Sequence, residues 1–182
     1  DGRAFRTAGT GFVYDDPRMR LPGDKVARLR AFYGGRRVGV TGGAGFIGGH
    51  LVDALLSLGA VITVIDDLSN SSTAQISELI ELEPDRVRFV HGSILDDAAL
   101  AEAMGLARGS PGPVQTVFHL AAMGSVPRSM ELPGRTWEVN ATGTLRVLEG
   151  ARGAGGARVV LAASSSAYGD DPALPKVESM AP

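Results

Sequence analysis

The chain alternates between short, continuously apolar runs and longer amphipathic segments. The apolar runs are rich in valine and lack strict alternation, which is typical of strands buried on both faces of a parallel sheet. They cover residues 38–40, 61–65, 87–90, 114–120 and 158–163. Segments with helical spacing lie between them, at residues 46–58, 74–82, 96–107 and roughly 134–152. This alternation predicts the α/β class, a doubly wound parallel sheet with crossover helices on both faces.

The first predicted helix has an apolar stripe that we expect to face the sheet. Its members follow one another at helical spacing: Ile47, Leu51, Leu55 and Leu58. The segment before the first strand lacks such a pattern. Residues 1–23 show no clear periodicity and contain several glycines and prolines, so an irregular extension is expected there. Residues 24–32 fit a short helix with Asp24 as its N-cap.

Composition limits the classes of function. A chain of 182 residues with 44% hydrophobic content can bury one sizeable core, which favours one globular domain over residues 35–182 behind an extension over residues 1–34. The sequence begins with Asp and ends in a polar, turn-rich stretch, so we expect it to be a segment of a longer protein. The net charge of −2 favours neither nucleic acid nor an anionic membrane surface as a partner.

The lack of cysteine excludes disulfides, thiolate metal sites and a cysteine nucleophile, and it favours a reducing compartment, the cytoplasm. No uninterrupted apolar stretch approaches the length of a membrane span, about 18 residues, and no signal peptide is recognisable at the start. His50 and His91 have no partners at ligand spacing, so no metal site is expected. His119 lies within an apolar strand, where a satisfied imidazole in the core or near the cleft is a better interpretation than a base.

A glycine cluster follows the first predicted strand, with five glycines among residues 42–49. Gly42, Gly45 and Gly48 lie between strand and helix, where a tight turn, close approach of a diphosphate and close helix packing each exclude a Cβ. The helix that begins near Phe46 would present free N–H groups and its positive dipole end to a phosphate. The same pattern also occurs in ordinary glycine-rich turns. Its position after a strand favours an anion cradle.

The second predicted strand ends in Asp66, eighteen residues beyond Gly48. A carboxylate at this place can accept both hydroxyls of an adenosine ribose and would repel a 2′-phosphate, so NAD is favoured over NADP. Asp67 follows directly, and the alternative for the pair is that both acids cap a loop.

Six motifs in order resemble the extended short-chain dehydrogenase/reductase family, in its nucleotide-sugar epimerase and dehydratase branch. They are TGGAGFIGGH, VIDDLSN, FHLAA, SVPRS, NATGTLRVLEGA and AASSSAYGD, and they begin at Thr41, Val64, Phe118, Ser125, Asn140 and Ala162. The resemblance implies that residues 35–182 form an NAD-binding Rossmann domain. It also implies that this domain is incomplete at its C-terminus and lacks the remaining strands and the substrate domain.

The resemblance implies a set of NAD contacts along the carboxyl edge of the sheet. They are Gly42, Gly45, Phe46, Ile47 and Gly48 for the diphosphate, Asp66 with Asp67 for the adenosine ribose, Asn70 and Ser71 for the adenine side or a phosphate, Ser93 and Ile94 for the adenine, Leu120, Ala121 and Ala122 beneath the nicotinamide ribose, and Asn140 near the cofactor. A surface or capping amide is the alternative for Asn140. Ser93 stands where the family often has Asp, which implies a weaker or rearranged adenine contact.

For the reaction, the resemblance implies that the hydroxyl of Ser164 hydrogen-bonds the reacting sugar oxygen. The substrate contacts that it implies are Ser125, Val126, Ser165 and Ser166. A gap of one or two residues would promote Ser165 or Ser166 to the catalytic position instead. Tyr168 is not the family's base, which belongs to a Tyr-x-x-x-Lys pair that does not occur among the 182 residues. The segment by itself is therefore expected to bind cofactor without catalysing the reaction.

The implied function is that of a UDP-hexose 4-epimerase, acting on UDP-glucose or UDP-N-acetylglucosamine by oxidation at C4, rotation of the keto sugar and return of the hydride. A 4,6-dehydratase is disfavoured because Ser165 and Ser166 replace its acidic pair, and a non-catalytic NAD-binding regulatory module is a further alternative. Arg128 is either a diphosphate ligand or a solvated side chain. Trp137, Val139, Leu145 and Leu148 lie on one predicted helix and belong either to the core or to a face that resembles the family's dimer interface, which implies a homodimer of the complete protein.

Overall fold

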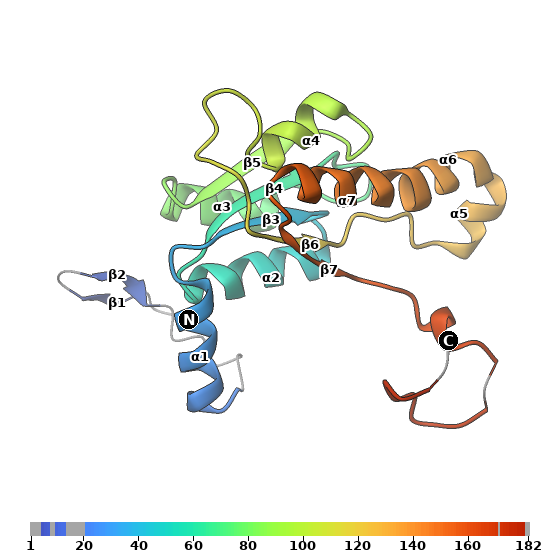
Figure 1. Ribbon diagram of the computed structural model, residues 1–182, viewed down its shortest axis with the longest axis horizontal. Helices are drawn as coiled ribbons and strands as arrows, with labels where there is room; N and C mark the ends of the chain where they lie inside the picture. The colour runs from blue at the N-terminus through green and yellow to red at the C-terminus, as the bar shows by residue number, and fades with distance from the viewer. Residues whose placement is uncertain (1–4, 8–9, 14–20, 171, 181–182) are drawn as a thin grey trace.

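The computed structural model describes residues 5–7, 10–13, 21–170 and 172–180 of the chain. Its centre is a parallel sheet of five strands in the order β5-β4-β3-β6-β7. The strands are β3 (Arg37–Thr41), β4 (Val61–Asp66), β5 (Val87–His91), β6 (Thr116–His119) and β7 (Arg158–Leu161). Each strand lies beside its neighbour in register, as in the pairs Val38↔Ile62 and Val38↔Thr116. The predicted doubly wound α/β class is confirmed (Figure 1).

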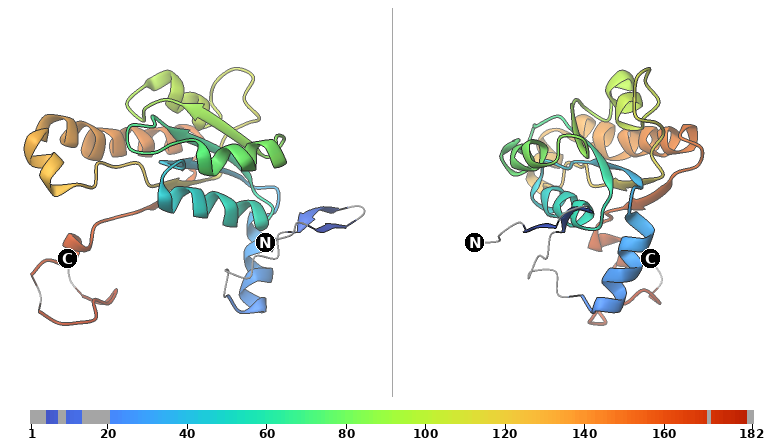
Figure 2. Two further views of the ribbon diagram at one scale, coloured as in Figure 1. Left: turned by 180° about the vertical axis from the view of Figure 1, so that it is seen from behind. Right: turned by 90° about the vertical axis from the view of Figure 1, so that its left-hand side faces the viewer.

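Helices cover both faces of the sheet, and each face has its own apolar cluster. On one face lie α2 (Phe46–Ser57) and α3 (Ala74–Leu82), whose buried side chains pack on β3 and β4. On the other face lie α4 (Asp97–Ala103) and α7 (Gly143–Gly153), which pack on β5 and β6 (Figure 2). Because both faces are covered, the central strands read as continuous apolar runs. This layering leaves the carboxyl edge of the sheet open for a ligand.

The buried face of α2 differs from the predicted stripe. Leu55 is buried as expected, but Val52 and Leu56 are also buried, whereas the side chain of Ile47 is 67% exposed. Ile47 lies in the first turn of the helix, beside the open carboxyl edge of the sheet, so nothing covers it. The stripe therefore predicted a helix correctly but misplaced its first member.

The long helix predicted near residues 134–152 is interrupted. It consists of α6 (Pro133–Trp137), a π-helical turn η1 (Glu138–Thr142) and α7, and the backbone N–H of Gly143 bonds the carbonyl of Glu138. A short helix that the sequence did not predict, α5 (Val126–Glu131), precedes it, with Ser125 as its N-cap. The helix predicted at residues 96–107 ends earlier, and Asp96 caps it by accepting the N–H groups of Ala98 and Ala99.

The N-terminal extension contains more regular structure than the sequence indicated. Two short antiparallel strands, β1 (Phe5–Thr7) and β2 (Thr10–Val13), precede α1 (Gly23–Tyr33). The expected helix is present, but the predicted Asp24 cap is wrong, because Pro22 occupies the N-cap position and no side chain caps the helix. The other residues before position 21 lie outside the described part of the chain. The division at residue 34 stays a prediction.

The end of the described chain leaves the sheet. After β7 the chain runs away from the helical layers and forms one short 3₁₀ turn, η2 (Ser165–Tyr168) (Figure 1). Val160 and Leu161 of β7 are 43% and 52% exposed, so this edge strand is only partly covered. No helix within the described residues is long and apolar enough to span a membrane.

Candidate functional site

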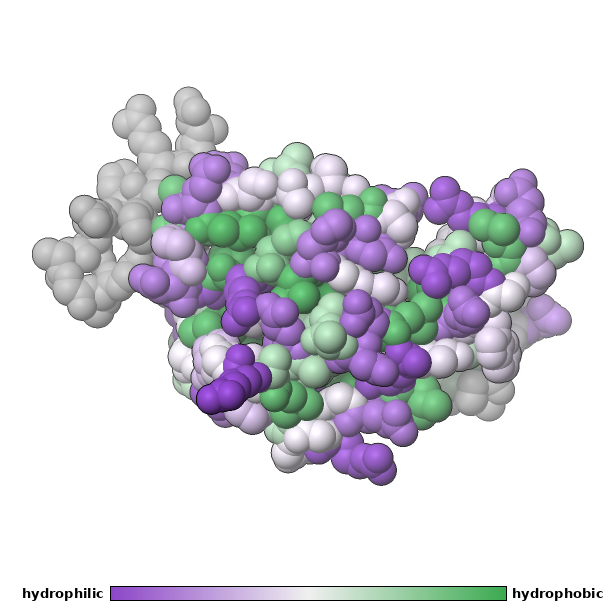
Figure 3. All heavy atoms as spheres, turned by 90° about the horizontal axis from the view of Figure 1, so that it is seen from above, coloured by the Kyte–Doolittle hydropathy of each residue, from purple (hydrophilic) through white to green (hydrophobic). Residues whose placement is uncertain are grey.

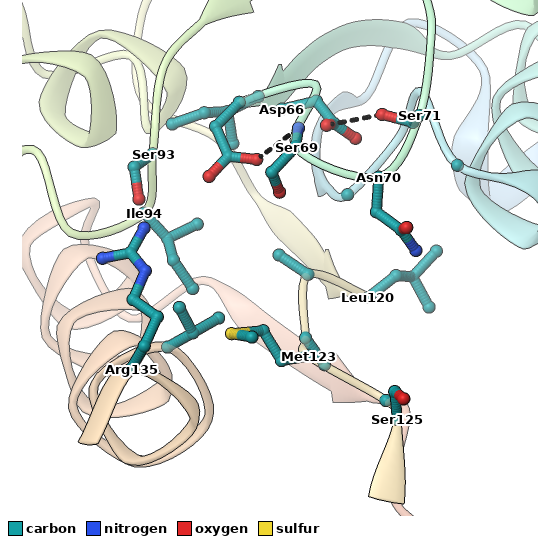
Figure 4. Close-up of a pocket in the computed structure, with 18 of the residues that line it drawn as sticks. Asp66, Ser69, Asn70, Ser71, Ser93, Ile94, Leu120, Met123, Ser125 and Arg135 are labelled. Carbon is teal, nitrogen blue, oxygen red and sulfur yellow. Dashed lines mark hydrogen bonds between the residues drawn. The ribbon is translucent and has the colours of Figure 1, made fainter. Parts of the chain in front are cut away.

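A cavity of about 700 Å³ opens at the carboxyl edge of the sheet. Its size falls within the usual range of small-molecule pockets, about 300–1,000 Å³. Segments that follow β3, β4, β5 and β6 line it, together with α5 and α6 (Figure 4). Twelve of the predicted site residues line this cavity: Gly42, Gly45, Asp66, Asp67, Asn70, Ser71, Ser93, Ile94, Leu120, Ala121, Ala122 and Ser125.

A Cβ would meet different neighbours at each of the three glycines in the loop after β3. Gly42 has a φ of +70°, and a Cβ there would lie 2.7 Å from the backbone nitrogen of Ala121. A Cβ at Gly48 would lie 2.2 Å from the Gly42 carbonyl oxygen, because helix α2 packs directly on the loop. At Gly45 the nearest atom would be that same oxygen at 3.3 Å, a tight but tolerable contact. The fold therefore requires glycine at positions 42 and 48, whereas Gly45 leaves room on the cavity side.

The carboxylate of Asp66 accepts hydrogen bonds from two loops, the glycine loop after β3 and the loop after β4. Its Oδ2 accepts the backbone N–H of Ala44 at 3.0 Å. Its Oδ1 accepts the N–H of Leu68 and the hydroxyl of Ser71, both at 2.9 Å. Leu68 has a φ of +57°, an unusual conformation for a branched residue, and its bond to Asp66 helps to hold it. The carboxylate thus has a fixed orientation at the cavity wall and still has lone pairs to offer.

The neighbouring acid, Asp67, also lines the cavity, and its Oδ1 accepts the N–H of Ser69 at 3.0 Å. Both acids therefore cap a loop, as the alternative interpretation of the sequence proposed. Loop capping does not prevent either carboxylate from also binding a ligand. Figure 4 shows Asp66, Asn70 and Ser71 on one side of the cavity and Ser93 with Ile94 on another. This arrangement places a carboxylate beside an apolar wall, which suits a ribose joined to a base.

The floor of the cavity is the strip of residues 120–124. Asn140 does not line the cavity but holds this strip, because its amide accepts the N–H of Met123 at 2.8 Å and donates to the Met123 carbonyl at 3.1 Å. A direct contact between Asn140 and a cofactor stays a prediction. Gly143, at the start of α7, lets the helix approach closely, since a Cβ there would lie 2.5 Å from the side chain of Ile94.

Two arginines line the cavity, of which the sequence analysis considered only Arg128. Arg128 lies on α5 and Arg135 on α6, and Figure 4 shows Arg135 extending toward Ser93. Arg135 also pairs with Glu138 at 3.5 Å. Apart from Arg128, sequence reasoning missed the lining residues Ile65, Ser69, Gly92, Met123, Gly124, Leu132, Arg135 and Val139. Their positions depend on helix packing, although several lie beside quoted motifs.

The remaining predicted residues lie elsewhere. Phe46 is 75% exposed and, like Ile47 and the buried Gly48, does not line the cavity. The first residue of α5, Val126, is 78% exposed. The contacts predicted for these four residues stay predictions.

The three serines after β7 lie together but outside the cavity lining. The Ser164 hydroxyl accepts the N–H of Ser166 at 3.1 Å and donates to its hydroxyl at 3.1 Å. All three side chains, including that of Ser165, are exposed. Their roles in catalysis and substrate binding stay predictions. Within the described residues no three His, Cys, Asp or Glu side chains are grouped so that they could hold a metal ion.

Comparisons with known proteins agree with this geometry. The family described as "NAD dependent epimerase/dehydratase family" matches residues 38–182. UDP-glucose 4-epimerase of Erwinia amylovora is 35% identical over 140 residues, which are 77% of this chain and 40% of that protein. The chain thus spans less than half the length of this relative.

Solved structures give the same picture. The epimerase Mth375 of Methanothermobacter thermautotrophicus superposes with a TM-score of 0.74 and 34% identity, over 87% of this chain and 44% of that one. UDP-glucose 4-epimerase of Brucella ovis, solved in complex with NAD, superposes with a TM-score of 0.66 and 32% identity, over 80% of this chain and 41% of that one.

Proposed function

We propose, from the premise that the chain belongs to the NAD dependent epimerase/dehydratase family, that it is the cofactor-binding part of a nucleotide-sugar epimerase. The whole protein would interconvert C4 epimers of a UDP-hexose through a transient 4-keto sugar. The observation that carries the proposal is the carboxylate of Asp66, fixed beside the glycine loop at the wall of the cavity. The named relatives are UDP-glucose 4-epimerases, which makes UDP-glucose the first substrate to test.

The residues present fit NAD. Gly45 leaves space where a diphosphate would approach the backbone, although the fold itself tolerates a Cβ there. The first N–H groups of α2 lack partners within the helix and would donate to phosphate oxygens. Asp66 would accept the adenosine ribose hydroxyls and repel a 2′-phosphate, while Ile94 offers an apolar surface to the adenine. Bound NAD would supply reversible hydride acceptance from the sugar.

This chain's own residues would bind and orient the cofactor and the sugar. The strip 120–122, with its small alanines, would keep room for the nicotinamide ribose, and Ser125 lies at the same wall. Arg128 carries a positive charge at the cavity and is suited to the diphosphate of a nucleotide sugar. Ser164 would hold the reacting hydroxyl once the segment after β7 lies over the cavity.

The exposed apolar side chains of α6 and α7 support the proposal of a homodimer. Trp137, Leu145 and Leu148 are 70%, 56% and 46% exposed. Figure 3 looks onto the side that carries α4 and α7, where apolar surface alternates with polar surface. We expect these residues to bury against a second copy in a homodimer of the whole protein. A cytoplasmic location is proposed from the lack of cysteine.

The test uses two preparations. Isothermal titration of the present chain with NAD and NADP measures cofactor binding, and NAD is expected to bind more tightly. The chain extended to the length of its relatives is then assayed with UDP-glucose and UDP-N-acetylglucosamine, and C4 epimers of at least one sugar should interconvert. Absence of both NAD binding and epimer formation would refute the proposal.

A further inference from the structure

His119 is a buried titratable side chain that the proposed reaction does not use. It ends β6 and is only 2% exposed. Burial lowers its pKa below the usual value of 6.5, because a charged imidazolium would lose its hydration there. The ring is therefore neutral near pH 7, with one nitrogen that donates and one that accepts.

The hydrogen bonds around His119 identify its tautomer. The Thr144 hydroxyl donates to the backbone carbonyl of Asn140 at 2.7 Å, so it must accept at its oxygen from His119 Nε2–H at 2.9 Å. Nδ1 then carries no proton and accepts the hydroxyl of Thr41 at 2.6 Å. Both ring nitrogens are satisfied, which confirms the prediction of a satisfied core imidazole.

The ring joins three segments that are far apart in the sequence. Thr41 is the last residue of β3 and directly precedes Gly42, Thr144 lies in the first turn of α7, and His119 directly precedes the cavity floor. The Thr41 oxygen also accepts the N–H groups of Leu120 and Ala121, both at 3.2 Å. The Leu120 N–H also donates to the backbone carbonyl of Thr41 at 3.1 Å, so the hydroxyl matters most for the Ala121 N–H. His119 determines which way that hydroxyl points.

The glycine loop and the floor touch where this network ends. A Cβ on Gly42 would lie 2.7 Å from the backbone nitrogen of Ala121, so the two backbones have no spare room between them. A side chain of similar size without nitrogens would leave the hydroxyls of Thr41 and Thr144 without their partner. The Thr41 hydroxyl could then rotate, and its bond to the Ala121 N–H would weaken, whereas the Leu120 N–H would keep the backbone carbonyl of Thr41 as its acceptor.

We propose that His119 is a positioning residue: as a rigid link between Thr41 and Thr144, it fixes the start of the floor, residues 120–122, against the glycine loop and thereby sets affinity for the nicotinamide half of the cofactor. This rests on the proposed function, because the floor matters to NAD only if NAD occupies the cavity. The adenosine half, at Asp66, Asn70 and Ser71, lies on other loops and should depend little on His119.

The decisive variant is Thr144→Val, which has the same shape but removes the acceptor of His119 Nε2–H. Its matched control is Thr136→Val, since the Thr136 hydroxyl makes a similar bond to the helix carbonyl of Leu132 without touching His119. His119→Leu removes both bonds of the ring, whereas His119→Gln keeps a side chain that can both donate and accept. Each protein is titrated with NAD and with AMP, and amide hydrogen exchange is measured over residues 120–123.

Thr144→Val should weaken NAD binding by roughly tenfold, the effect of one lost and partly buried hydrogen bond, while AMP affinity changes by less than about twofold. Hydrogen exchange at the Ala121 amide should speed up. The control should change none of these, and His119→Gln should bind NAD more tightly than His119→Leu. Equal losses for NAD and AMP, or unchanged floor exchange in Thr144→Val, would overturn the inference. If the unaltered chain bound neither ligand, its proposed role as the cofactor-binding part would fail, and the exchange data would still decide whether His119 positions the floor.

Discussion

Replacing Asp66 with Asn tests the double role of this carboxylate. The variant keeps the shape and removes the charge. If its oxygen takes the place of Oδ1, the N–H of Leu68 and the hydroxyl of Ser71 keep an acceptor. The amide nitrogen then faces the N–H of Ala44, and two donors oppose each other. Ala44 is 4% exposed, so water cannot easily replace the lost acceptor.

The expected loss of stability follows from the one hydrogen bond that Asp66→Asn removes, the bond from the Ala44 N–H. A hydrogen bond to a charged group contributes about 1.5–3 kcal/mol. The free energy of unfolding should fall by this amount. For a domain of this size each kcal/mol shifts Tm by about 2–4 °C, so Tm should drop by roughly 3–12 °C. The neutral amide also no longer repels a 2′-phosphate, so the preference for NAD over NADP should narrow by roughly tenfold.

Two assays separate these effects. Urea denaturation without ligand measures stability, and isothermal titration with NAD and NADP measures selectivity. Asp67→Asn is the comparison variant, because it removes the same charge from the next residue of the cavity lining, whose hydrogen bond goes to Ser69 and not to the glycine loop. Asp67→Asn should lower the free energy of unfolding less than Asp66→Asn does, and it should change the preference for NAD over NADP less. A variant of Asp66 that matched the unaltered chain in stability and in cofactor preference would refute the reasoning about this carboxylate.

Three further outcomes are expected. Gly45→Ala should leave the free energy of unfolding nearly unchanged and weaken NAD binding by roughly tenfold. Gly48→Ala should lower the free energy of unfolding by about 1–3 kcal/mol, because the new Cβ would lie 2.2 Å from the Gly42 carbonyl oxygen; urea denaturation and isothermal titration with NAD, done on both variants, measure the two effects. Burial lowers the pKa of His119, so the unfolded chain binds a proton first as the pH falls. The contribution of His119 to the free energy of unfolding should be full above the ordinary pKa of 6.5 and should be lost as pH drops from there toward the lowered pKa; His119→Gln should remove this pH dependence, which urea denaturation at a series of pH values would show. In the extended protein, Ser164→Ala should lower epimerase turnover by roughly 10²-fold with cofactor affinity unchanged, and a normal rate, with the loss at one of the two following serines instead, would move the catalytic position.

The local pattern of the sequence was enough to predict the strands of the sheet and the part of the site formed by the glycine loop and the end of β4. Valine-rich runs separated by amphipathic segments predict buried parallel strands, and all five are present with boundaries shifted by a few residues at most. Gly42 and Gly48 were recognised because a tight turn and close packing are constraints within one short segment. Asp66 was recognised because it ends a strand at a fixed spacing from that loop.

Interactions between distant segments were decided only by the tertiary structure. The sequence showed a histidine in a strand, but its partners Thr41 and Thr144 lie 78 and 25 residues away. Likewise, no periodicity indicated that Arg135 would reach the cavity or that Asn140 would hold Met123, because both depend on how the interrupted helix packs beside the floor. Secondary structure follows from the period of apolar residues along the chain, whereas hydrogen-bond partners follow from which ends of the strands and helices the fold brings together.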